Sequence, residues 1–166
     1  MPITLILTAT LLLSGDSPQR RAPGAPNQGG VTATIALRAG TQAYDFSGTA
    51  QCRHAPQASI YGIAAEMWSV QHADSGRSMN LTVWKPRSGG DPMLNLSVTT
   101  AGRSSNVNTV KAPQRATGAS GSGSVTFAPE GKGGLFTIAA TTDDGAKVSG
   151  TVKCDAFTPL VAEGGN

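Results

Sequence analysis

The chain has 166 residues, a length that suits one domain with a hydrophobic core and is short for two. Charged residues make up only 14% of it, and its 21 glycines and 10 prolines favour strands and turns over long helices. The net charge of +3 comes from basic residues that are spread singly, except for Arg20 and Arg21. This dispersal excludes nucleic-acid binding, which requires a clustered basic face.

The N-terminus carries an apolar run, ITLILTATLLL at residues 3–13, which has the length of a signal-peptide core and is too short to span a bilayer. We therefore expect residues 1–15 to be a signal-peptide-like segment. The chain would then be exported to the periplasm, the cell surface or the extracellular space, with no transmembrane span in the mature protein. The preceding Met1-Pro2 carries no basic side chain, so the start codon is misassigned or the signal is atypical, and a buried N-terminal strand is the structural alternative.

The residues after this run resemble a bacterial lipobox, Leu13-Ser14-Gly15, but Asp16 stands where the lipid-accepting cysteine would be. A carboxylate cannot take that lipid, so the sequence does not predict a lipoprotein. Residues 16–30 are rich in proline, glycine and polar residues and predict a flexible tether. We expect a β-domain at residues 31–157 and a disordered tail at residues 158–166.

From residue 31 onward, short runs of alternating apolar and polar residues are separated by glycine, proline, asparagine and aspartate. Such runs occur at residues 31–38, 44–53, 79–84, 94–98, 125–127, 136–138 and 147–154. Turns are predicted at residues 75–77, 129–134 and 143–145, a strand rather than a helix at 60–67, and a long, partly mobile loop at 102–122. The pattern predicts an all-β, antiparallel β-sandwich of about 7–8 strands, with a half-open barrel as the alternative.

The two cysteines, Cys52 and Cys154, end two matching runs, DFSGTAQC and KVSGTVKC. The alternation within each run places both thiols on the apolar face. Two thiols in an oxidising compartment normally join, so we expect a disulfide, with two separate buried thiols as the alternative. Closure of a loop of about a hundred residues would contribute on the order of 4–5 kcal/mol of stability in the chain-entropy account.

Three further features have counterparts in one family: the G-x-x-x-C strand from Gly48 to Cys52, the GSGSVTF strand at residues 121–127, and the closing strand that ends in Cys154. With the lipobox-like start and the tether, this layout resembles the mycobacterial 19 kDa lipoprotein antigen family over most of residues 40–155. The resemblance implies an exported, membrane-tethered, disulfide-closed and non-enzymatic β-domain with roles at the cell surface and in host recognition. Asp16 departs from the lipidated position of that family.

Residues that carry catalytic or metal chemistry are few. The two histidines, His54 and His72, cannot make a zinc or copper site alone when both cysteines are paired. Residues 143–145 lack the spacing of a calcium loop, and residues 121–124 lack that of a nucleophile elbow. We therefore expect no catalytic residue, metal or cofactor, and an enzyme of unknown class is the third possibility.

One surface stretch, Trp84, Lys85 and Arg87, has the composition of a recognition site for a sugar, a protein or an anionic envelope polymer. The alternative is that Trp84 packs beneath the loop at residues 102–122. We expect an exported bacterial, non-catalytic binding or structural module at the cell surface or in the periplasm. Its partner would be an unknown protein or an envelope glycan or other polymer; the alternative function is a structural subunit that assembles through its edge strands.

Overall fold

The computed structural model describes residues 29–111 and 120–160, which form ten strands and no helix. The predicted signal-like segment and nearly all of the predicted tether lie outside the described residues. The strands are β1 (Val31–Ala39), β2 (Gln42–Ile60), β3 (Ile63–Asp74), β4 (Arg77–Pro86), β5 (Met93–Thr100), β6 (Arg103–Asn108), β7 (Ser122–Glu130), β8 (Gly133–Thr141), β9 (Lys147–Cys154) and β10 (Thr158–Pro159). The all-β, antiparallel class expected from the sequence is confirmed.

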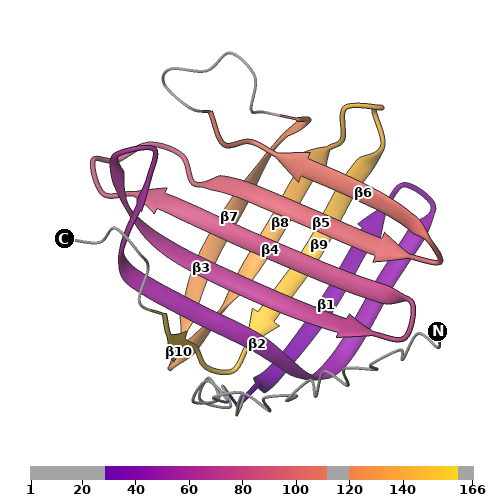
Figure 1. Ribbon diagram of the computed structural model, residues 1–166, viewed down its shortest axis with the longest axis horizontal. Helices are drawn as coiled ribbons and strands as arrows, with labels where there is room; N and C mark the ends of the chain where they lie inside the picture. Colours follow the sequence, from indigo (N-terminus) through magenta and orange to yellow (C-terminus); the bar gives the residue numbers. More distant parts are fainter. Residues whose placement is uncertain (1–28, 112–119, 161–166) are drawn as a thin grey trace, which may run out of the picture.

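A single path of paired strands runs through the molecule in the order β6-β5-β4-β3-β2-β1-β9-β8-β7, and the short β10 pairs with β2 in parallel. The long β2 takes part in two layers, since residues 42–50 pair with β1 and residues 51–60 pair with β3. Figure 1 shows β2 to β6 as the front layer, with β1, β9, β8 and β7 crossing behind it at a steep angle. We call these the front layer and the back layer.

The two ends of this path approach each other. Asn108, the last residue of β6, forms an isolated antiparallel bridge with Ser120, which precedes β7. Two backbone hydrogen bonds of 2.7 and 2.8 Å, one in each direction, join this pair. The sheet is therefore nearly closed and barrel-like. The expected sandwich of about 7–8 strands is not confirmed, because β2 joins the layers and ten strands contribute.

The core follows the alternation seen in the sequence. Inward side chains such as Ile35, Leu37, Leu81 and Val83 are at most 1% exposed, whereas their neighbours on each strand face outward. The runs expected at residues 125–127 and 136–138 pair across the turn after β7, with Val125 opposite Ile138 and Phe127 opposite Phe136. The other large inward side chains that are less than 2% exposed are those of Tyr44, Met79, Leu94, Leu96, Val70, Val98, Phe136 and Ile138.

The predicted disulfide between Cys52 and Cys154 is confirmed, and both residues are 1% exposed. Cys154 of β9 lies opposite Ala33 of β1, whereas Cys52 lies two residues beyond the last residue of β2 that pairs with β1. The bridge therefore crosses the beginning of β1 and ties β2 to β9 inside the core. Its Cα atoms are 6.3 Å apart and 102 residues apart in sequence.

An aromatic cluster connects the two layers. Trp68 of β3 lies 4.7 Å from Phe127 of β7 and 6.4 Å from Phe136 of β8, measured between ring centroids. Phe157 contacts Phe127 and Phe136 edge-on, and His54 stacks on Trp68 at 5.0 Å. Since Trp68 belongs to the front layer and the phenylalanines to the back layer or the segment after it, this cluster fills the space between them.

Three segments differ from the sequence-based expectation. The stretch at residues 102–122, expected to be a loop, contains β6, because pairing with β5 needs only one inward apolar side chain, Val107. The tail expected to be disordered from residue 158 begins with β10, whose backbone pairs with Arg53 and His54. Residues 60–67 are extended as expected, but a tight turn at residues 61–62 divides them between β2 and β3.

Candidate functional site

The outer face of the front layer carries rows of side chains that the strand register brings side by side. Because alternate residues of a strand point to opposite faces, burial of Met79, Leu81 and Val83 turns Asn80, Thr82 and Trp84 outward on β4. One row crosses all five strands, one residue from each, and we call it the polar row. Its members, from β2 to β6, are Gln51, Gln71, Asn80, Ser97 and Asn106.

Two more rows flank the polar row, and the three together are called the polar face. On one side the register aligns Arg53, Ser69, Thr82, Asn95 and Asn108, and on the other Ala73, Ser78, Thr99 and Ser104. Arg53 is the one charged residue among these described positions, and its Nη2 donates a hydrogen bond of 2.8 Å to Oε1 of Gln51 at the end of the polar row. The polar face is thus a broad surface of amides and hydroxyls with almost no charge.

A surface hollow of about 680 Å³ opens on this face. Four members of the polar row, Gln51, Gln71, Asn80 and Ser97, line it together with Ser78. The hollow has a cause in the topology: β2 pairs with β3 only from residue 51 onward and with β1 before that, so the two strands splay apart here. Gly30, just before β1, and Thr49 and Ala50 of β2 also line it, and His72, Ala73 and Met79 of β3 and β4 complete the lining.

The other end of the polar face is apolar. Trp84 is half-buried and lies in register between Met67 of β3 and Met93 of β5, both also half-buried. The row continues to Ala55 on β2, which is 1% exposed. This arrangement explains the burial of Trp84 by its cross-strand neighbours and places its indole at the border of the polar face.

The three residues expected to form a recognition surface do not gather in one place. Lys85 alternates with Trp84 along β4 and lies opposite Glu66, while the guanidinium of Arg87 donates to the carbonyl oxygen of Pro56. Lys85 and Arg87 line a separate hollow of about 440 Å³ with Pro56 and Glu66. Trp84 therefore lies next to the polar face, whereas Lys85 and Arg87 lie at the end of β4, around the separate hollow.

The histidines are held by aromatic and polar neighbours in two different places. Nε2 of His54 lies 2.8 Å from a carboxylate oxygen of Glu66, and its ring stacks on Trp68. Nδ1 of His72 lies 2.6 Å from the Tyr44 hydroxyl, and its ring stacks on Phe46 at 3.6 Å. Within residues 29–111 and 120–160 no three His, Cys, Asp or Glu side chains gather as metal ligands would.

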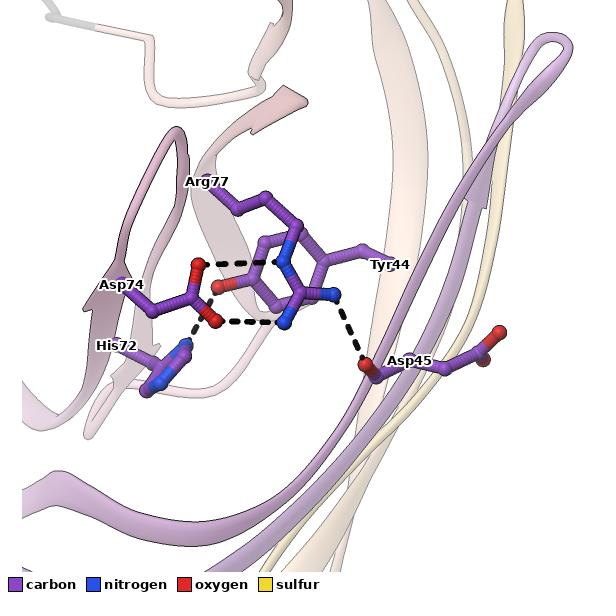
Figure 2. Close-up of polar contacts among 5 residues, drawn as sticks. All are labelled: Tyr44, Asp45, His72, Asp74 and Arg77. Atoms are coloured by element: carbon purple, nitrogen blue, oxygen red, sulfur yellow. Dashed lines mark hydrogen bonds and ion pairs between the residues drawn. The ribbon is translucent and has the colours of Figure 1, made fainter. Parts of the chain in front are cut away.

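Figure 2 shows the surroundings of His72, where the end of β3 and the start of β4 meet Tyr44 and Asp45 of β2. Arg77 donates to both carboxylate oxygens of Asp74, at 3.2 and 2.5 Å, and to the backbone oxygen of Asp45 at 3.3 Å. Its guanidinium also lies over the Tyr44 ring, 5.4 Å from the centroid. The hydrogen bonds from Arg77 hold the pKa of Asp74 below its usual range, and burial of the Tyr44 hydroxyl raises the pKa of that group.

The raised pKa of Tyr44 predicts that the protein loses stability at alkaline pH. Its folded-state pKa is raised, so the stabilisation from the neutral hydroxyl is complete below the unfolded-state pKa near 10.0 and is lost as the pH rises above it. In a Tyr61→Phe variant, Tyr44 is the single tyrosine of the chain, and tyrosinate absorbance should rise together with loss of the circular dichroism of the fold. Tyr44→Phe should make the unfolding free energy less sensitive to pH in this range; ionisation of Tyr44 in a fully folded protein at its ordinary pKa would contradict the prediction.

The sequence did not single out the polar row. Gln51, Asn80 and Ser97 occupy outward positions of predicted strands, but Gln71 lies outside these runs and Asn106 lies in the stretch expected to be a loop. Finding the row requires knowledge of which strands are neighbours and of their register, because five isolated amides and hydroxyls become one surface only when β2 to β6 align.

The described residues contain no helix with the length and hydropathy of a membrane span. Comparison with family models, with curated proteins and with solved structures yields no match to this chain.

Proposed function

We propose that this chain is an exported, non-catalytic binding module of a bacterial cell envelope, and that it binds through the polar face and Trp84. The observation that carries this proposal is the continuity of the outer rows, in which Arg53 is the one charged residue, from the 680 Å³ hollow to Trp84. Amide and hydroxyl groups can donate and accept hydrogen bonds, and a half-buried tryptophan supplies rigid contact area at low entropic cost.

Export is supported by the apolar run at residues 3–13 and by the buried disulfide, because such bonds persist in oxidising compartments. The resemblance to the mycobacterial lipoprotein antigen family supports the same location. A passive role is supported by the histidines, since each is engaged by an aromatic ring and one polar neighbour. Assembly through edge strands has less support, because the ends of β6 and β7 approach each other at the Asn108–Ser120 bridge.

Binding to isolated cell-envelope material tests the proposal. The purified chain should sediment with envelope fragments, and Trp84→Ala should weaken this binding about tenfold or more, as loss of an anchoring tryptophan does at other recognition surfaces. Tyr61→Ala is the matched control, because Tyr61 is an aromatic residue that is 63% exposed on the β2–β3 turn, away from the polar face. Full binding by a folded Trp84→Ala variant would contradict the proposal.

A further inference from the structure

We infer that the ligand of the polar face is a neutral polysaccharide, which extends along β4 from the hollow at Asn80 to the indole of Trp84. This inference rests on the binding role proposed above and narrows it to one class of ligand. It follows from the hydrogen-bonding groups of the face, from its lack of charge, and from the distance between the hollow and the tryptophan.

The amides of the polar row have open hydrogen-bonding positions. Each Asn or Gln side chain carries two N–H donors and one carbonyl acceptor. Those of Gln71, Asn80 and Asn106 form no side-chain hydrogen bond with any of the described residues, so both kinds of group are free for a ligand. Sugar hydroxyls also donate and accept, and they match the amides and the hydroxyl of the polar row, which do both.

The charge of the face selects against ionic polymers. A phosphate or carboxylate held against the sheet would lose water without a cation to compensate it, and a cationic ligand would find no carboxylate. Arg53 lies at the β2 end of its row, and its Nη2 is already bonded to Gln51. The other cations nearest to Trp84 in sequence, Lys85 and Arg87, line the separate 440 Å³ hollow. A neutral ligand fits these surroundings best.

The geometry of the sheet suits an extended chain of sugars. Asn80 and Trp84 are four residues apart on β4, roughly 13 Å at a rise of about 3.3 Å per residue, which is the length of a few sugar rings. Thr82 lies between them, flanked across the register by the exposed Asn95 and by Ser69, which is only 8% exposed. A chain on this path would begin in the hollow, cross a row of hydroxyl and amide groups, and end with an apolar sugar face against the indole.

The test measures binding of the purified full chain to soluble neutral polysaccharides, with dextran, mannan and arabinogalactan as probes and dextran sulfate as the charged counterpart. Isolated envelope fragments are added with and without periodate, which oxidises vicinal sugar diols. We expect binding to a neutral probe that changes little with salt, and loss of envelope binding after periodate. Asn80→Asp and Gln71→Glu should each weaken binding about tenfold or more, since they keep the shape and remove the amide donors.

Gln57→Glu is the matched control, because it makes the same chemical change at an exposed amide near the β2 bulge, outside the polar face. It should leave binding unchanged. If envelope binding resisted periodate in the wild type but was lost in Trp84→Ala, the proposed binding function would be supported and the inference of a polysaccharide ligand overturned. That result would point to a protein or lipid partner. Binding to dextran sulfate alone, with steep loss in salt, would also overturn the inference. Absence of any envelope binding would overturn both proposals.

Discussion

Removal of the Cys52–Cys154 bridge is expected to lower the free energy of unfolding by about 4–5 kcal/mol, the value for closure of a loop near a hundred residues. The bridge spans 102 residues and joins β2 to β9, so reduction frees most of the folded domain in the unfolded ensemble. The total free energy of unfolding of a single domain is about 5–15 kcal/mol, so the reduced protein would be only marginally folded. Denaturant unfolding followed by circular dichroism, with and without reductant, measures the difference.

The Cys52→Ala/Cys154→Ala double variant separates the cross-link from the chemistry of the thiols. Both sulfurs are buried, so alanine avoids the unsatisfied hydroxyl groups that serine would bring into the core. The double variant should unfold at a denaturant concentration close to that of the reduced wild type. If the oxidised protein, the reduced protein and the variant shared one midpoint, the cross-link would have no stabilising role.

Much of this fold could be predicted from local pattern. Alternation fixed which side chains of β1, β4 and β9 point inward, and it placed both cysteines on that side before their pairing was known. Turn chemistry located the β3–β4 and β8–β9 hairpins, where Gly76 and Gly145 have positive φ values of 85° and 84°. These features depend on residues close together in sequence, so the chemistry of each segment was sufficient.

The remaining features depend on long-range pairing. The closure of the sheet depends on β2 changing partner at residues 50 and 51, which no local composition marks. The edge strand β6 is hidden in a serine- and asparagine-rich stretch, because an edge position tolerates polar residues on most of its length. The polar face required the same information, and Trp84 was correctly assigned to the outward side while its separation from Lys85 and Arg87 was missed.

Truncation of the aromatic cluster between the layers should also lower the free energy of unfolding by a large amount. Trp68→Ala is expected to lower the free energy of unfolding by about 3–5 kcal/mol, as truncation of a buried Trp generally does. Trp68 is 4% exposed, and its ring contacts His54 of its own layer and Phe127 and Phe136 of the other. The variant would leave a cavity where the front and back layers meet, so both layers should loosen together in one cooperative transition.

Trp68→Phe is the conservative control, because it keeps a ring against Phe127 and should recover much of the lost stability. Trp84→Ala is the second control, since Trp84 lies half-buried on the outer face and its loss should cost far less. The chain has two tryptophans, so Trp84→Ala leaves Trp68 as the single fluorophore, reporting on the core, and Trp68→Phe leaves Trp84 as a reporter of ligand at the polar face. Equal destabilisation by Trp68→Ala and Trp84→Ala in denaturant titrations would mean that the interlayer cluster does not hold the two layers together.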